Sequence, residues 1–314
     1  MADTDNKKEE KTLFFGHRNP DTDSVISAII LAGELGGTPC YQDQLNEETK
    51  FVLDYCEVDH PQKIDKVAGR TVFLVDFNGQ SQAPDDILQA ELEGIVDHHN
   101  LASDVVPSAN PVTVIMEPVG CTCTILSEKF FDMGIIDAKE AKMMLCAILS
   151  DTLAFRSPTT TESDVKAADV LAQKAGVGDA EGLAKLIFKA KSNLAGKTIA
   201  EIIDLDYKVF EMGQRKVGIA LVETIEPEKI VAKQADFVAY LEKKREEDKL
   251  DYLIFCVVDI WEQNCIFLMP TELEKSLVST VFGKSEVIED NFYKVDGIVS
   301  RKKQIVPPIK DYLS

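Results

Sequence analysis

The sequence has no long hydrophobic run, and it has few positive charges for its length. None of its apolar stretches approaches the roughly 18 residues that a membrane-spanning helix needs. The first eleven residues are polar and charged, so we expect no secretory signal peptide. Lys and Arg number 34 against 54 Asp and Glu, a formal net charge of −20. This balance argues against nucleic acid and anionic membranes as partners, and any anionic substrate must meet local cations.

Paired cysteine motifs are also missing. The seven cysteines are an odd number, and they lack the spacing of zinc-binding sites. Several lie in apolar segments, so we expect reduced thiols and a cytoplasmic protein. Cys121 and Cys123 could bind a metal together, although buried packing is the simpler interpretation.

The first part of the chain alternates between short strands and helices. At 314 residues the chain is long enough for two domains. Strands rich in Val, Ile and Leu, each followed by helical patterns, predict a mostly parallel sheet covered by helices. We expect strands at 13–15, 71–76, 94–97 and 112–116, and helices at 25–32, 120–133, 137–150, 161–175 and 180–190.

The pattern changes around residues 192–196. Beyond that point we expect helices at 197–211, 227–246 and 271–282, strands at 217–223, 252–259 and 265–269, and a final strand pair near Ile298 and Ile305. The sequence therefore predicts an α/β protein with one domain at 1–191. A smaller C-terminal α/β domain with a mixed sheet follows at 197–314.

A polar loop at residues 16–24, with the sequence GHRNPDTDS, joins the first strand to the first helix. Asn19-Pro20 delays the helix, because the residue before proline avoids the helical region. The side chains of His17, Asp21 and Asp23 can then converge on one point. Imidazole and carboxylate suit Mn, Fe, Co or Zn, and carboxylate-rich sites lean to Mn and Mg. Alternatively the segment is only a turn, with Asp23 or Ser24 as the helix N-cap.

Three later segments end apolar strands or helices with similar groups. They contribute Asp76, Asp97-His98-His99 and Asp151, and three of the four histidines of the chain lie in these segments or in the first loop. The carboxyl ends of parallel strands share one edge of a sheet, so we expect the groups to be neighbours. The predicted ligands are His17, Asp21, Asp23, Asp76, His98 and Asp151. Six ligands fit two metal ions about 3.5–4 Å apart with one bridging carboxylate, an arrangement that serves in-line phosphoryl displacement.

A concentrated cationic stretch lies near the end of the chain, at residues 300–304. Arg301 offers a bidentate fork and Lys302 a point charge for phosphoryl oxygens. The alternative is a solubilising surface turn, since most charge runs are solvated.

Residues 16–24, Asp97-His98-His99, Ser150-Asp151-Thr152-Leu153 and the stretch 300–304 together resemble the family II inorganic pyrophosphatases. These belong to the Asp-His-His phosphoesterase superfamily, and the resemblance spans about residues 12–310. It implies an enzyme that hydrolyses pyrophosphate to two phosphates, by in-line attack of a metal-bridged hydroxide on phosphorus. It further implies two Mn²⁺ or Co²⁺ ions per subunit, Mg²⁺ accompanying the substrate, an active site in the interdomain cleft and a cytoplasmic homodimer.

The resemblance also implies roles for individual residues. His17 and Asp21 would bind one metal, Asp23, His98 and Asp151 the other, and Asp76 both. The phosphate-binding set would be His99, Lys208, Arg301 and Lys302, which together with Asp76 form the implied catalytic set. Asp97 would support a histidine, the usual role of such a carboxylate.

Three positions depart from the family pattern. Arg18 replaces the usual Lys, Phe77 stands where His is usual, and Gly79 where Glu is common. The side chains next to the bridging carboxylate therefore differ, which bears on metal preference and rate. The chain lacks the long insertion that carries nucleotide-sensing domains in some relatives, so we do not expect direct control by adenine nucleotides.

Two other functions compete with this interpretation. A phosphodiesterase of the superfamily would act on short oligonucleotides or nucleotide phosphates, but such relatives carry a glycine-rich, histidine-containing motif that this sequence lacks. A non-enzymatic metal-binding scaffold would not need the complete ligand set. Release of phosphate from pyrophosphate, against release of nucleotide from a dinucleotide, separates the three.

Overall fold

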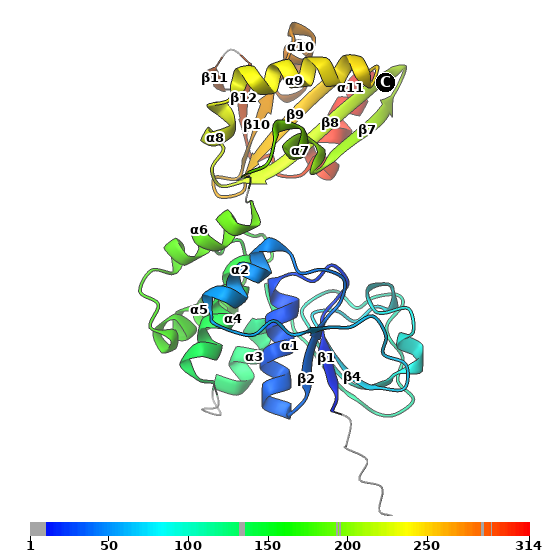
Figure 1. Ribbon diagram of the computed structural model, residues 1–314, viewed down its shortest axis with the longest axis vertical. Coiled ribbons are helices and arrows are strands. Elements are labelled where there is room, and N and C mark those ends of the chain that lie inside the picture. Colours follow the sequence, from blue (N-terminus) through cyan, green and yellow to red (C-terminus); the bar gives the residue numbers. More distant parts are fainter. Residues whose placement is uncertain (1–10, 132–135, 193, 195, 284–285, 290) are drawn as a thin grey trace, which may run out of the picture. The chain divides into compact units, whose positions relative to one another are not determined.

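The computed structural model describes residues 11–131, 136–192, 194, 196–283, 286–289 and 291–314 (Figure 1). The charged segment 1–10 and the end of the helix expected at 120–133 lie outside these residues. The chain divides into two compact units, Met1–Ala190 and Lys191–Ser314, which we describe in turn. No helix among the described residues is both long and apolar enough to cross a membrane.

The first unit is built on a six-stranded sheet in the order β3-β2-β1-β4-β5-β6, with every neighbouring pair parallel. Its strands are Leu13–Phe15 (β1), Thr38–Tyr41 (β2), Gln62–Lys63 (β3), Thr71–Val75 (β4), Glu91–Asp97 (β5) and Thr113–Met116 (β6). The strand order reverses between β1 and β4. Such a switch point is where open parallel sheets place their sites, just beyond the carboxyl ends of the strands.

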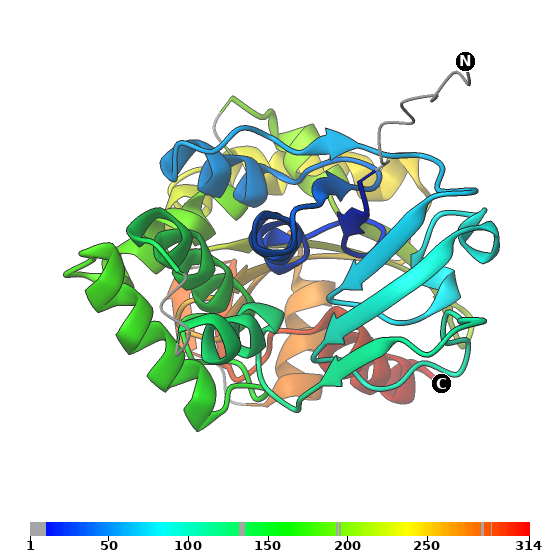
Figure 2. The same cartoon turned by 90° about the horizontal axis from the view of Figure 1, so that it is seen from below.

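Helices gather on one side of this sheet (Figure 1). They are Thr22–Leu35 (α1), Glu47–Tyr55 (α2), Thr122–Phe131 (α3), Ala138–Asp151 (α4), Glu162–Ala175 (α5) and Ala180–Lys191 (α6). Figure 2 shows α1 nearly end-on, between the sheet and the green helices. Its residues Val25, Ile26 and Ile30 are fully buried, and the helix contains the predicted range 25–32. The helix ends at Gly36, whose φ of 75° suits the left-handed cap that glycine favours.

A second layer of apolar side chains includes Phe15, Leu74, Phe77 and Ile95, which belong to one buried cluster. Phe77 is 0% exposed, and its ring centroid lies 6.0 Å from that of Phe15. Phe77, which we expected to depart from the family pattern, is therefore part of the hydrophobic core.

The second unit contains a mixed sheet in the order β11-β12-β10-β9-β8-β7, in which only β8 and β9 run parallel. Its strands are Tyr207–Met212 (β7), Arg215–Thr224 (β8), Tyr252–Asp259 (β9), Asn264–Leu268 (β10), Glu286–Glu289 (β11) and Phe292–Asp296 (β12). Its helices are Ile199–Asp204 (α7), Glu228–Val231 (α8), Gln234–Glu247 (α9), Glu272–Phe282 (α10) and Val306–Leu313 (α11), preceded by a π-helical turn at Arg301–Ile305.

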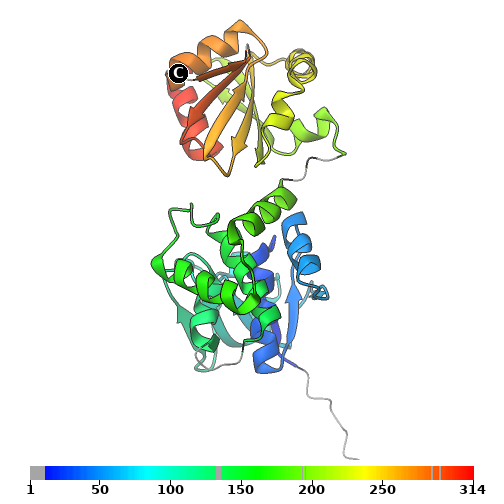
Figure 3. The ribbon, with the colours of Figure 1, turned by 90° about the vertical axis from the view of Figure 1, so that its left-hand side faces the viewer.

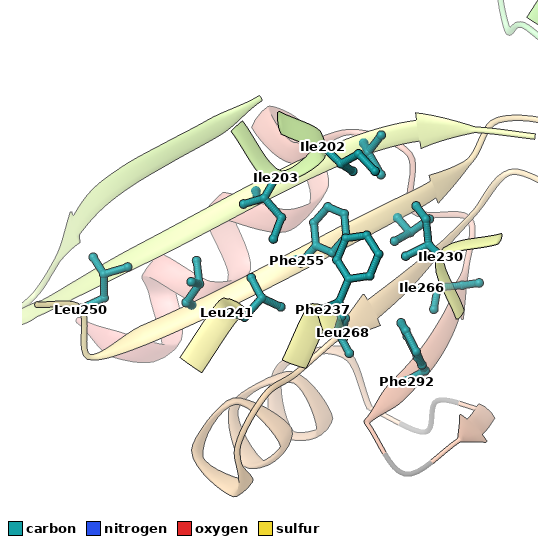
Figure 4. Packing of buried hydrophobic residues seen from close by; sticks show 14 residues of the cluster. Ile202, Ile203, Ile230, Phe237, Leu241, Leu250, Phe255, Ile266, Leu268 and Phe292 are labelled. Atoms are coloured by element: carbon teal, nitrogen blue, oxygen red, sulfur yellow. The ribbon is translucent and has the colours of Figure 1, made fainter. Parts of the chain in front are cut away.

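Helices cover both faces of the mixed sheet (Figure 3). On the face of α7 and α9, Phe237 stacks on Phe255 with ring centroids 5.4 Å apart, and Figure 4 shows this pair among the surrounding aliphatic side chains. On the face of α10 and α11, Leu277 and Ile309 belong to a second buried cluster. The predicted class, α/β with a parallel and then a mixed sheet, is confirmed.

Two predicted helices of the second unit are wrong in part. The helix expected at 197–211 ends at Asp204, and residues 207–212 form strand β7, which turns into β8 at Gly213. The helix expected at 227–246 is interrupted around Lys233, whose φ and ψ are −109° and 23°.

The expected final strand pair near Ile298 and Ile305 is also wrong. The last strands are β11 and β12, and residues 301–313 are helical. Two prolines, Pro307 and Pro308, lie in the first turn of α11, where a missing N–H costs no helical hydrogen bond.

Candidate active site

The loop after β1 turns sharply into helix α1. Asp21 is the N-cap, with Oδ1 accepting a hydrogen bond from the Ser24 backbone N–H at 3.0 Å, so capping by Asp23 or Ser24 is corrected to Asp21. A Cβ on Gly16 would lie 2.4 Å from the Cβ of Ser24, which is why the tight return needs glycine. The Oδ2 atom of Asp21 is thereby left to face Nε2 of His17 at 3.4 Å.

Asp76 follows β4 and forms the centre of the cluster. Its φ is 64°, in the left-handed region that few residues other than glycine adopt, and strain of this kind gathers at functional sites. Its side chain is 1% exposed. The hydroxyl of Ser24 donates to its Oδ2 at 2.7 Å, and the hydroxyl of Thr122 donates to its Oδ1 at 3.2 Å.

Two histidines approach this carboxylate, one from the loop after β1 and one from the end of β5. Nε2 of His17 lies 3.4 Å from Oδ2 of Asp76, and Nε2 of His98 lies 3.2 Å from its Oδ1. One oxygen of Asp76 thus faces each imidazole, the arrangement needed for a carboxylate that bridges two cations.

A further group is formed by the first turn of α1, the residue after β5 and the end of α4. Ligand atoms of Asp23, His98 and Asp151 all lie within 4.8 Å of one another. The carboxylate of Asp23 accepts the backbone N–H groups of Thr122 at 2.6 Å and Cys123 at 3.0 Å, where the positive end of the α3 dipole favours an anion. The structure thus brings together all six residues predicted as metal ligands.

His17 and His98 each point Nε2 into the cluster and Nδ1 at a backbone carbonyl. The distances are 2.7 Å from His17 to the carbonyl of Arg18 and 3.0 Å from His98 to that of Val119. A carbonyl can only accept a hydrogen bond, so in a neutral ring Nδ1 carries the proton and the lone pair of Nε2 is available to a metal.

Two buried polar atoms of the cluster have no hydrogen-bond partner among the described residues, which suits them to bind cations. Nε2 of His98 and Oδ2 of Asp151 accept or donate no hydrogen bond to any described residue, although they lie only 3.3 Å apart. Buried polar groups are normally paired, and both atoms are of kinds that bind divalent metals. The residues present therefore fit a pair of metal ions.

Proton affinities in the cluster reflect its crowded negative charge. Burial lowers the pKa of His17, but its hydrogen bonds with Asp21 and Asp76 outweigh this and raise the pKa to about 11. For His98, burial again lowers the pKa, and the nearby carboxylates raise it to about 10. Protons on these rings balance the carboxylates when cations do not.

The carboxylates are affected differently according to their neighbours. Burial raises the pKa of Asp76, but its two histidine neighbours bring it far below the ordinary value. Burial, and then the charge of Asp76, raise the pKa of Asp23 to about 6. Burial and the surrounding carboxylates also raise the pKa of Asp151 well above its ordinary value.

His99 lies beside the cluster and is oriented by Asp97. Oδ1 of Asp97 accepts from both the backbone N–H and Nδ1 of His99, each at 3.0 Å, while Asn78 donates to Oδ2 at 2.5 Å. His99 is half exposed, and its Nδ1 lies 3.6 Å from Oδ1 of Asp76. Its ring can therefore contact a solvent-borne ligand.

The thiols of Cys121 and Cys123 form another group with Asp23. Their ligand atoms lie within 4.8 Å of one another, and both cysteines are fully buried. Burial raises the pKa of both thiols, so they are protonated at neutral pH and behave as core side chains.

The predicted phosphate-binding cations of the second unit, Lys208, Arg301 and Lys302, line one pocket of about 340 Å³. Arg301 donates to the carboxylate and to the carbonyl of Asp206, each at 2.6 Å, and its side chain is 9% exposed. Nζ of Lys208 lies 3.8 Å from the same carboxylate. Asp206 thus contacts both Arg301 and Lys208 at one pocket. Asp206 was not singled out from the sequence, although its position two residues before Lys208 could have indicated it.

Sequence reasoning missed several polar supports of the cluster. Ser24 and Thr122 bind Asp76, and Asn78 binds Asp97. Ser24 lies inside the recognised loop and could have been found there, whereas Thr122 lies in a predicted helix with no local sign of a role.

A parallel-sheet unit with an Asp and His cluster beyond its strand ends, followed by a mixed-sheet unit with a basic pocket, defines the class of DHH phosphoesterase-like proteins. Residues 11–148 match the model "DHH family, N-terminal domain", and residues 185–312 match the "DHHA2 domain".

Curated relatives cover nearly the whole chain. A Bacillus cereus (strain B4264) protein named "Probable manganese-dependent inorganic pyrophosphatase" is 40% identical over 310 residues, 96% of this chain and 98% of its own. A Bacillus cytotoxicus protein of the same name is 39% identical over the same shares. A solved Methanococcus jannaschii structure, assigned to the family II inorganic pyrophosphatases, is 35% identical with a TM-score of 0.63, covering 96% of this chain and 98% of its own. The chain belongs to the family II inorganic pyrophosphatases.

Proposed function

We propose that this protein is a metal-dependent inorganic pyrophosphatase that hydrolyses pyrophosphate to two phosphates. The observation that carries this proposal is the cluster of four Asp and two His side chains, with Asp76 presenting one oxygen to each imidazole. The names of the relatives that match the whole chain support the same reaction.

Within this proposal, two cations share the cluster. His17, Asp21 and Asp76 hold one, and Asp23, His98, Asp151 and Asp76 hold the other. Sites that combine several carboxylates with imidazole favour Mn²⁺ or Co²⁺. We propose two such ions per subunit, and Mg²⁺ that accompanies the substrate. When bound, such ions polarise phosphoryl oxygens and lower the pKa of a coordinated water near neutrality.

The remaining side chains handle the substrate. Lys208, Arg301 and Lys302 supply positive charge to phosphoryl oxygens, with Arg301 held by Asp206. His99, held by Asp97 through Nδ1, has its Nε2 left for the same anion, to which it donates a hydrogen bond when the ring carries both protons. In a protein of net charge −20, these local cations are what makes an anionic substrate acceptable.

The proposal includes a homodimer and a cytoplasmic location. Strand β6 lies at the edge of the parallel sheet and exposes Val114 at 51%, which supports a homodimer through this edge. All seven cysteines are free and buried, which supports a reducing compartment such as the cytoplasm. The negative net charge supports the absence of nucleic acid and membrane partners.

The test is an activity matrix of metals and substrates on chelator-stripped protein. We expect no phosphate release from pyrophosphate until Mn²⁺ or Co²⁺ is added, and no nucleotide release from a dinucleotide with any metal. Full activity after exhaustive chelation would refute metal dependence. Nucleotide release would instead indicate the phosphodiesterase, and inactivity with every metal and substrate would indicate the scaffold.

A further inference from the structure

Glu48 is a buried carboxylate next to the metal cluster that no step of the proposed reaction uses. It lies in the first turn of α2 and is 3% exposed. Its Oε1 accepts hydrogen bonds from the hydroxyl of Thr22, at 2.8 Å, and from the hydroxyl of Ser150. Its Oε2 is buried and accepts no hydrogen bond from any residue in the described part of the chain.

The two hydroxyls belong to the segments that carry the predicted ligands. Thr22 lies between Asp21 and Asp23 at the start of α1, and Ser150 directly precedes Asp151 at the end of α4. One oxygen of Glu48 therefore joins two ligand-bearing segments that are far apart in sequence. A carboxylate oxygen has lone pairs for both donors, so it can fix both hydroxyls at once.

Stability alone does not explain a carboxylate at this position. Burying an ionisable group with one oxygen unpaired is unfavourable, and the favourable effect of an acidic residue on the first turn of a helix is already supplied by the exposed Glu47. Departures from good local packing of this kind are typical of functional sites.

We propose that Glu48 is a positioning residue for the metal pair: through Thr22 and Ser150 it sets the separation of Asp21 and Asp23 from Asp151. The inference rests on the proposed metal-dependent function. It assigns Glu48 no contact with metal or substrate, and its effect arises from the two hydrogen bonds and not from its charge.

The test compares Mn²⁺ binding to chelator-stripped wild type, Glu48→Ala and Glu48→Gln, by isothermal titration and by the electron paramagnetic resonance signal of unbound Mn²⁺. We expect Glu48→Ala to weaken binding by about 10–100-fold, the usual effect of removing a group that orients metal ligands. Glu48→Gln should bind nearly as wild type, because its amide oxygen can accept from both hydroxyls. Glu47→Ala, which removes a neighbouring carboxylate of the same helix turn, should bind as wild type.

Two results would overturn the inference. One is wild-type Mn²⁺ binding by Glu48→Ala, and the other is a loss in Glu48→Gln as large as in Glu48→Ala, which would make the charge responsible. If Glu48→Ala does not fold, Ser150→Ala removes one of the two donors and should weaken binding in the same sense; unchanged binding there would also overturn it. Failure of the wild-type protein to bind Mn²⁺ would instead refute the proposed function.

Discussion

Asp76 combines a strained backbone with a buried charge. A left-handed φ of 64° is tolerated by Asn about as well as by Asp, so Asp76→Asn changes the charge and leaves the backbone alone. The amide cannot serve two cations as a bridging carboxylate does. We expect metal stoichiometry to fall and turnover to drop by about 10²-fold or more. Metal analysis and phosphate release check this, and wild-type values in both would remove Asp76 from the site.

Protonation of the cluster predicts how stability depends on pH in the stripped protein. The pKa of Asp23 is raised to about 6 from 3.8, so stability from its protonated form is lost as pH rises through 6. The pKa of His17 is raised to about 11 from 6.5, so its contribution is complete below 6.5 and is lost towards 11. Asp23 lowers the stability of the stripped protein between pH 3.8 and about 6, and His17 lowers it between pH 6.5 and about 11, so His17 dominates above pH 6.5.

Mn²⁺ should oppose this trend, because metal binding displaces the protons, and the affinity for the metal therefore rises with pH. Urea unfolding at pH 6.5 and at about pH 9, with and without Mn²⁺, measures both effects. We expect the free energy of unfolding of the stripped protein to be lower at the higher pH, and the gain from Mn²⁺ to be larger there. A stripped protein that is more stable at the higher pH would contradict the prediction.

At the same scale, the six predicted ligands could be found because imidazole and carboxylate ended apolar segments. Of their supports, Ser24 and Asp97 lie in recognised motifs, but Glu48 and Thr122 could not be found in this way. Glu48 and Thr122 are ordinary residues of polar or small-residue helices, and their contacts are made across about 26 to 102 positions of sequence. Such pairings depend on the packing of whole helices, which local patterns do not encode.

Among the elements, strongly periodic segments were predicted best. The strands and helices of the first unit that carry continuous apolar runs appear as expected. Strands β2 and β3 and helix α2 were missed. Strand β2 contains Pro39, and β3 has only two residues. In α2 the only buried apolar residues are Val52 and Leu53, too few to show a helical period.

In the second unit, strand β7 was mistaken for helix, since Tyr207 and Phe210 have the i, i+3 spacing of a helix face. In the strand they lie on opposite faces, and each packs against a different buried cluster.

The β7–β8 hairpin depends on Gly213. Its φ is 60°, and an added Cβ would lie 2.4 Å from the carbonyl oxygen of Leu313. Gly213→Ala should therefore lower the free energy of unfolding by about 1–3 kcal/mol, through strain and a clash with α11. Urea unfolding measures it.

Gly297→Ala is the matched control for this variant. Gly297 has a φ of 76°, and among the described residues no heavy atom lies within 4 Å of the Cβ that alanine would add. Its substitution therefore introduces the strain without the clash. A loss in Gly213→Ala no larger than in Gly297→Ala would show that the contact with Leu313 is unimportant.

For the whole molecule, the predicted metal ligands and the predicted phosphate-binding residues Lys208, Arg301 and Lys302 lie in different units. The six predicted ligands precede residue 152, whereas Lys208, Arg301 and Lys302 belong to the second unit. Arg301→Ala should lower kcat by about 10²-fold, comparable to losing one donor to a developing oxyanion. The affinity for Mn²⁺ should be nearly unchanged, because the ligands lie elsewhere.

Steady-state kinetics and Mn²⁺ titration test this division of labour. If Arg301→Ala raises KM alone and leaves kcat intact, Arg301 binds substrate and transition state equally and does not serve the chemical step. A fall in Mn²⁺ affinity would show that the two units do not act separately.

The order of the ligands along the chain has a consequence for synthesis. The cluster takes residues from four segments between His17 and Asp151, joined by a parallel sheet whose contacts are far apart in sequence. Such sheets form late, after long loops have closed. On the ribosome the last ligand emerges before the second unit is made, and domains fold as units from the N-terminus. If the proposed ligands and phosphate-binding residues are right, a nascent chain can bind metal ions while it still lacks Lys208, Arg301 and Lys302, and it gains activity only when translation of the second unit ends.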